Sequence, residues 1–168
     1  CPWANRTLIA RSLKKLNEHI SVDVVHPIML DDGWTFEYFG DESRGDHIYK
    51  SSFLHEIYTR VDPQITSRVT VPILWDKQRE TIVSNESSEI LRMFNQAFNH
   101  ITGSTLDLYP IPLRKEIDEI NERVYHKVNN GVYRAGFATT QAAYNEAVLE
   151  LFDALEWIEN HLEGRQYL

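Results

Sequence analysis

The chain has a single cysteine, so no intrachain disulfide can form, and one unpaired cysteine fits a reducing cytoplasm. It also lacks any apolar run close to the ~20 residues that a membrane span needs. Basic residues are in the minority, 17 against 25 acidic ones, and the net charge of −8 argues against nucleic acid or an anionic membrane as partner. We therefore expect a cytoplasmic protein without nucleic-acid or membrane partners.

Signals for metal and phosphate binding are missing too. The seven histidines are scattered without the close spacing of metal ligands, and no glycine-rich phosphate loop occurs, so no metal is predicted. The apolar content of 42% suffices for a core in one domain or two small ones. No methionine begins the chain and no strand leads into its first predicted helix, so we expect an internal piece of a longer protein.

Cys1 is the most informative residue, because it stands at a predicted helix start. Pro2 suits a first helical turn, since it has no N–H to lose and its φ is fixed. Apolar residues then recur at roughly helical spacing, which predicts a helix over residues 2–16. The free N–H groups and the dipole of a helix N-terminus favour a thiolate, so Cys1 is expected to be a nucleophile. The alternative is that Cys1 is a small buried apolar residue.

The pattern along the chain changes near residue 100. Before it, helices and strands alternate around an irregular segment at 27–45; after it, everything is predicted to be helical. Strands are predicted at 20–25, 69–75 and 80–83, and the polar residues 76–79 are expected to form a tight hairpin link between the last two. Helices are predicted at 46–61, after 84–87, at 113–128 and at 140–161, and the aromatic segment 129–137 joins the last two. An α/β unit followed by an all-helical unit indicates two packed modules.

Two motifs in the first module indicate ligand binding. Pro72 inside a predicted strand is either an ordinary trans proline at a sheet edge or a cis proline, which would leave the backbone groups of Val71 free for an extended peptide. Ser87, before the next helix, is either a helix cap or part of a carboxylate site. Glu86 beside it could accept a ligand ammonium group.

These motifs together resemble a known family. Cys-Pro-x-x-x-Arg at a helix start, then Val-Pro, then Glu-Ser before a helix is the glutathione transferase pattern, and Cys-Pro resembles its Omega branch. Longer strings resemble the glutathionyl-hydroquinone reductases, also called Xi-class glutathione transferases. The strings are Cys1-Pro2-Trp3-Ala4, Gly33-Trp34-Thr35-Phe36, Val71-Pro72-Ile73-Leu74-Trp75-Asp76, Ile82-Val83-Ser84-Asn85-Glu86-Ser87 and Val128-Asn129-Asn130-Gly131-Val132-Tyr133-Arg134-Ala135-Gly136-Phe137. Asn5 departs from the family, which usually has His there.

The resemblance implies a fold and an activity. Residues 1–100 would form an α/β thioredoxin-like, glutathione-binding domain lacking its first strand, and residues 101–168 the start of the all-α C-terminal domain, so that both are truncated. Cys1 would attack the sulfur of a glutathionyl-hydroquinone, release the hydroquinone and form a mixed disulfide with glutathione. A second glutathione, the co-substrate, would then release glutathione disulfide, which is an exchange that needs one cysteine and not a pair.

The resemblance also implies the site residues. Val71, preceding Pro72, would pair with the cysteinyl backbone of glutathione. Glu86 and Ser87 would hold its γ-glutamyl end, Trp34 and Arg68 would lie at its glycyl side, and Tyr133 would face the hydroquinone. Without the resemblance, Trp34 is interpreted as a core aromatic residue and Arg68 as a solvated charge.

Two other functions remain open at this point. One is an Omega-like thioltransferase or dehydroascorbate reductase; the other is a non-catalytic interaction module, because a fold alone does not determine a function. The joint presence of Cys1, Pro72, Glu86 and Ser87 favours the enzyme, and the strings around Trp34 and at 129–137 favour the hydroquinone reductase. Members of the family are homodimers, so a homodimer is also expected.

Overall fold

A computed structural model describes residues 1–40 and 45–168; residues 41–44, inside the segment predicted to be irregular, lie outside the described residues. The chain divides into two compact units, Cys1–Leu108 and Tyr109–Leu168. The division lies slightly beyond the predicted boundary after residue 100. Among the residues that the structure describes, no helix is both long enough and apolar enough to cross a membrane.

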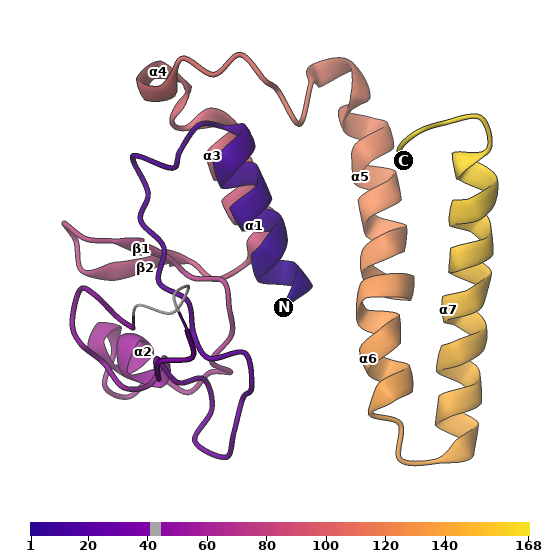
Figure 1. Cartoon of the computed structure of the whole chain (residues 1–168). Coiled ribbons are helices and arrows are strands. Elements are labelled where there is room, and N and C mark those ends of the chain that lie inside the picture. Colours follow the sequence, from indigo (N-terminus) through magenta and orange to yellow (C-terminus); the bar gives the residue numbers. More distant parts are fainter. Residues whose placement is uncertain (41–44) are drawn as a thin grey trace. The chain divides into compact units, whose positions relative to one another are not determined.

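The first unit is a small hairpin between helices (Figure 1). Strands β1 (Leu74–Asp76) and β2 (Thr81–Ser84) pair antiparallel, as the polar link between them predicts. Helices α1 (Pro2–Leu13) and α3 (Ser87–Gln96) enclose a core of Ala10, Leu16, Ile90 and Phe94, against which Leu74 packs. Helix α2 (His55–Val61) forms a second core, Leu54, Ile57 and Tyr58, with Trp75 and Ile82. The short helix α4 (Asn99–Thr102) follows α3.

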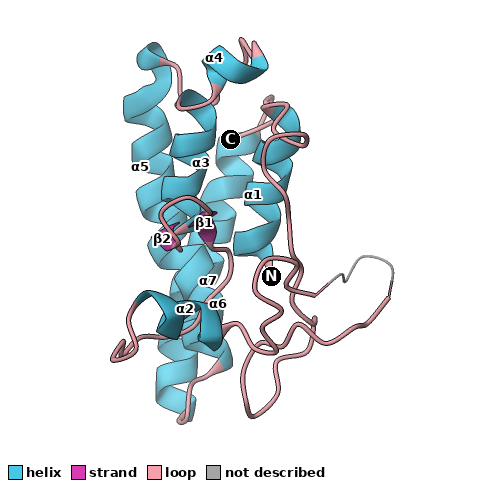
Figure 2. Ribbon diagram, turned by 90° about the vertical axis from the view of Figure 1, so that its left-hand side faces the viewer, coloured by secondary structure: helices cyan, strands magenta, loops and turns pink. Residues whose placement is uncertain are grey.

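The second unit is helical, as predicted (Figures 1 and 2). Its elements are a 3₁₀ turn (Ile111–Leu113), α5 (Arg114–Val124), a π-helical turn (Tyr125–Asn129), α6 (Asn130–Gly136) and α7 (Gln141–Leu162). Thr140 caps α7 by accepting from the N–H of Ala143. Between α6 and α7, Glu150 accepts from Arg134 at 2.9 Å and lies 3.0 Å from the Lys127 ammonium. These two cations lower the pKa of Glu150.

The segment 129–137 is not a linker, because it contains the whole of α6. Gly131 is buried, and a Cβ built there would lie 3.7 Å from the side chain of Leu151 on α7. That distance is an ordinary van der Waals contact, so the space between the helices does not require glycine, and the helix forms despite the low helix propensity of this residue. The actual link between α6 and α7 is the short stretch around residues 137–140.

The predicted strand at 20–25 and most of the one at 69–75 are wrong. Residues 20–25 form no ladder, because no described segment pairs with them; Ile20 and Val25 instead pack on the two different cores. In the second case only Leu74 and Trp75 belong to a strand. Pro72 offers no N–H to a ladder, which agrees with regular pairing beginning after it.

The predicted helix at 46–61 begins only at His55. The buried Asp46 carboxylate accepts hydrogen bonds from the N–H groups of Ile48, Tyr49 and Ser51, and these bonds hold a turn in place of a helix. Burial alone would raise the pKa of Asp46, but the backbone donors outweigh it, so the pKa is lowered. The early part of the segment is thus organised by one side chain and not by helical hydrogen bonds.

Candidate active site

Cys1 lies at the N-cap position of α1, as its sequence context predicts, with Pro2 in the first turn. The residue is exposed, its thiol is free, and its backbone carbonyl accepts from the N–H of Asn5 at 3.0 Å. Its Sγ lies 3.9 Å from the carbonyl oxygen of Val71. A solvent-accessible thiol at a helix N-terminus is the arrangement in which cysteines are nucleophilic. The alternative that Cys1 is a small buried apolar residue is therefore wrong.

The peptide bond between Val71 and Pro72 is cis, which confirms that alternative for the proline. Both residues are half-buried and lie beside Cys1, so the structure brings these three predicted site residues together. Within the described residues no hydrogen bond engages the N–H of Val71, and its carbonyl meets only the Cys1 thiol. The backbone of Val71 is therefore available to an extended peptide ligand next to the nucleophile.

Glu86 and Ser87 lie at the N-terminus of α3, and of the two alternatives for Ser87 the helix cap is wrong. Glu86 is the N-cap, and its Oε1 accepts from the N–H and the hydroxyl of Ser88, each at 3.2 Å. Ser87 is the first residue of the helix and is 2% exposed. Glu86 is exposed, so it forms the outer part of this pair.

Arg6 connects the helix of Cys1 with this pair. Its Nε and Nη2 donate to the Ser87 hydroxyl oxygen at 3.0 and 2.7 Å, and Nη2 lies 3.9 Å from Glu86 Oε1. Its guanidinium also lies 4.9 Å from the ring centre of Trp3. Burial lowers the pKa of Arg6, while the charge of Glu86 acts in the opposite direction. Sequence patterns predicted no role for Arg6 in the site. Its position in the Cys-Pro-x-x-x-Arg motif was the signal that could have indicated one.

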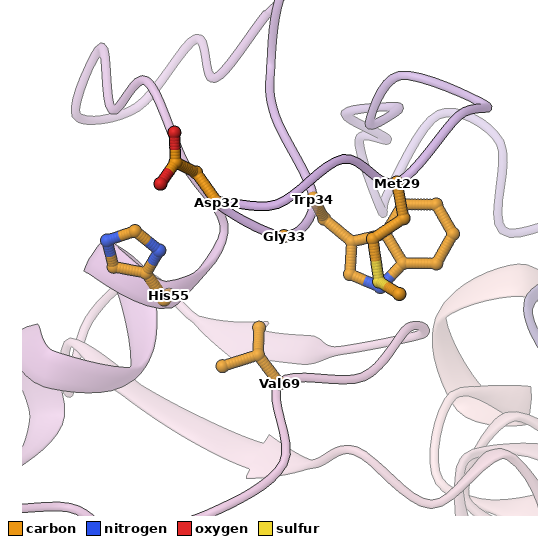
Figure 3. A pocket seen from close by; sticks show the side chains of 6 residues that line it. All are labelled: Met29, Asp32, Gly33, Trp34, His55 and Val69. Atoms are coloured by element: carbon orange, nitrogen blue, oxygen red, sulfur yellow. The ribbon is translucent and has the colours of Figure 1, made fainter.

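Trp34 belongs both to a core and to a pocket. Its side chain is half-buried against the core of α2, and its carbonyl accepts from the N–H of Leu54 at 2.9 Å. The pocket is lined by Met29, Asp32, Gly33, Trp34, His55 and Val69 (Figure 3). The interpretation of Trp34 as a core aromatic residue and its expected place beside a ligand are therefore compatible.

The two remaining predicted site residues, Arg68 and Tyr133, belong to different units of the chain. Arg68 is exposed, immediately before the pocket residue Val69, and within the described part of the chain its guanidinium forms no ion pair. Tyr133 belongs to α6 in the second unit, where its ring stacks on that of Phe137. No group of three or more potential metal ligands occurs among the described residues.

The comparison with known proteins settles the family. Residues 1–97 match the family described as "Glutathione S-transferase, N-terminal domain". The chain belongs to the glutathione S-transferase family. It is 52% identical over its full length to "Glutathionyl-hydroquinone reductase YqjG" of Escherichia coli and 54% identical to "Glutathionyl-hydroquinone reductase PcpF" of Sphingobium chlorophenolicum. The chain spans about half the length of these curated relatives, 51% and 53%.

Solved structures agree with this assignment. The glutathione-bound structure of YqjG superposes with a TM-score of 0.96 over 100% of this chain and 55% of that one, at 52% identity. Glutathione transferase Xi 1 from Trametes versicolor gives a TM-score of 0.96 at 51% identity, covering 100% of this chain and 59% of the other. The fold is therefore the predicted one, a thioredoxin-like glutathione transferase N-terminal domain followed by a helical region.

Proposed function

We propose that the protein is a glutathionyl-hydroquinone reductase in which Cys1 is the catalytic nucleophile. The observation that carries the proposal is the exposed Cys1 thiol at the start of α1, 3.9 Å from the carbonyl of Val71 in the cis peptide. The names of the relatives at 52% and 54% identity support it. We further propose that residues 1–100 are the glutathione-binding domain and 101–168 part of the helical domain of a cytoplasmic homodimer.

The proposed reaction has two steps. The Cys1 thiolate attacks the glutathione sulfur of the conjugate, and the bond between that sulfur and the aromatic carbon breaks. The electron pair of the broken bond stays on the ring carbon, which then takes a proton from solvent. The ring carbon of the conjugate is thereby reduced, which gives the hydroquinone, and the two sulfurs are oxidised to a mixed disulfide. A second glutathione thiolate then attacks the mixed disulfide, which releases glutathione disulfide and restores Cys1.

The free backbone of Val71 fits the peptide character of glutathione. We propose that its N–H and C=O pair with the cysteinyl residue of the tripeptide, which aligns the ligand's sulfur with Cys1. Pro72, by following Val71 in the cis peptide, turns these groups toward the nucleophile. An extended ligand bound by main-chain hydrogen bonds is a common mode of peptide recognition.

The N-terminus of α3 fits the γ-glutamyl end. The helix start favours the ligand's carboxylate, and the exposed Glu86 suits its ammonium group. Arg6 occupies the two lone pairs of the Ser87 oxygen, so the hydroxyl hydrogen remains to be donated. We propose that Trp34 and Arg68 bind the glycyl side and that Tyr133 contacts the hydroquinone.

The test begins with intact mass after incubation of the intact protein with glutathione disulfide. We expect one glutathione adduct on the wild type and none on Cys1→Ser, followed by turnover of a glutathionyl-hydroquinone by the wild type alone. Near wild-type turnover by Cys1→Ser would contradict the mechanism. An adduct without hydroquinone turnover, but with reduction of a small mixed disulfide, would identify an Omega-like thioltransferase instead.

A further inference from the structure

One phenolic oxygen joins the two segments that carry the proposed glutathione contacts. Tyr58 lies on α2 and is 3% exposed. Its hydroxyl donates to the carbonyl of Thr70 at 3.1 Å and accepts from the N–H of Thr70 and from Asn85 Nδ2, both at 3.3 Å. A phenolic hydroxyl has one hydrogen and two acceptor positions, so its bonding capacity is full.

The two partners of Tyr58 occupy key positions in the sequence. Thr70 immediately precedes Val71, whose backbone faces Cys1, and Asn85 immediately precedes Glu86, the cap of α3. Asn85 Nδ2 also donates to Thr70 Oγ1 at 3.2 Å, so the two segments contact each other directly. Three hydrogen-bonding groups of Thr70 are thereby held, two by Tyr58 and one by Asn85.

We propose that Tyr58 is a positioning residue for glutathione, a role that rests on the proposed function above. By fixing Thr70 and Asn85, its hydroxyl sets the separation between the Val71 backbone and the N-terminus of α3. A ligand that contacts both segments then binds a site whose shape is already formed, and less of its binding energy is lost in ordering the protein. Tyr58 itself touches no ligand atom in this scheme.

Removal of the oxygen alone tests this role. Phenylalanine at position 58 keeps the ring in the core with Leu54 and Ile57. The backbone N–H and C=O of the exposed Thr70 then form hydrogen bonds with water in place of the Tyr58 hydroxyl. In the intact protein, Tyr58→Phe should raise KM for glutathione about 5- to 10-fold, the equivalent of roughly one hydrogen bond, with kcat within about twofold. Backbone amide exchange at Thr70 should become faster in the variant without any ligand present.

Tyr49→Phe is the matched control. The Tyr49 hydroxyl donates to Glu80 Oε1 at 3.4 Å, next to the hairpin turn. Like Tyr58→Phe, this substitution removes one phenolic oxygen, and Tyr49 packs on the core that contains Tyr58. KM for glutathione should be unchanged in this control. Asn85→Ala should also raise KM, and its effect should be less than additive with that of Tyr58→Phe, because the two residues share a hydrogen bond.

The outcomes separate this role from the proposed function. An unchanged KM in Tyr58→Phe, beside normal wild-type turnover, would overturn the positioning role alone. Equal increases in KM for Tyr58→Phe and Tyr49→Phe would do the same, because the effect would then not depend on Thr70 and Asn85. A wild-type protein without glutathione-dependent turnover would overturn the proposed function, and the positioning role with it.

Discussion

The bond between Arg6 and Ser87 gives the sharpest prediction about stability. Ser87→Ala deletes one oxygen at a position that is 2% exposed, and with it both hydrogen bonds of the Arg6 guanidinium, at 3.0 and 2.7 Å. Hydrogen bonds to charged groups contribute about 1.5–3 kcal/mol each. The Arg6 side chain is 34% exposed, so water replaces part of the lost bonding. We therefore expect a loss of about 1–2 kcal/mol in the free energy of unfolding.

Chemical denaturation of the intact protein measures this loss, and the neighbouring serine supplies the control. Ser88 is exposed, and its hydroxyl donates only to Glu86 at 3.2 Å among the described residues, so Ser88→Ala should stay within about 0.5 kcal/mol of the wild type. In an Arg6→Lys background, the cost of Ser87→Ala should shrink, because lysine cannot donate two fixed hydrogen bonds to one oxygen.

Two results would refute this reasoning. Equal costs for Ser87→Ala and Ser88→Ala would mean that the guanidinium bonds contribute nothing measurable. A cost of Ser87→Ala that stays the same beside Arg6→Lys would place its origin elsewhere, in packing around the start of α3. Calorimetric titration with glutathione adds a second readout, in which Ser87→Ala should weaken binding by about 0.5–1.5 kcal/mol.

Two further variants extend the test to charge. Glu86→Gln keeps an acceptor for the N–H of Ser88, so the free energy of unfolding should change by less than about 1 kcal/mol. Calorimetric titration should nevertheless show weaker glutathione binding, because the negative charge is lost. Unchanged binding would mean that Glu86 does not contact the ligand. The pKa of Asp46 in the folded state lies below its ordinary value of 3.8. The ionised carboxylate therefore stabilises the fold above pH 3.8, and this contribution is lost as the pH falls through the lowered pKa. The difference in unfolding free energy between wild type and Asp46→Asn should therefore narrow below about pH 4 in a denaturation series; a constant difference would contradict it.

Features with local causes could be predicted from the amino-acid sequence. Pro2 after Cys1 favours a helix start, because a first-turn residue needs no N–H partner, and the structure places Cys1 at that helix start. The amphipathic pattern predicts a long helix at 140–161, and the structure has this helix at Gln141–Leu162 with Thr140 as its cap. The polar link between the two short strands likewise predicted the hairpin.

Features that depend on distant partners arise only when the chain is folded. Residues 20–25 alternate like a strand, but a strand exists only where a neighbour supplies hydrogen bonds, and no described segment does so. Gly131 lies inside α6 despite the low helix propensity of glycine, and it is buried next to Leu151 of α7, a tertiary contact that no local propensity indicates.

In the candidate site, too, some residues could be predicted from local motifs and others only from tertiary contacts. Cys1, Pro72 and Glu86 were found by their motifs, whereas Tyr58 carried no signal in the sequence. Its hydroxyl gains its role from Thr70 and Asn85, which lie 12 and 27 residues away along the chain. A side chain that acts by joining separate segments acquires that function only when the fold brings them together, because hydrogen bonds form only at short range.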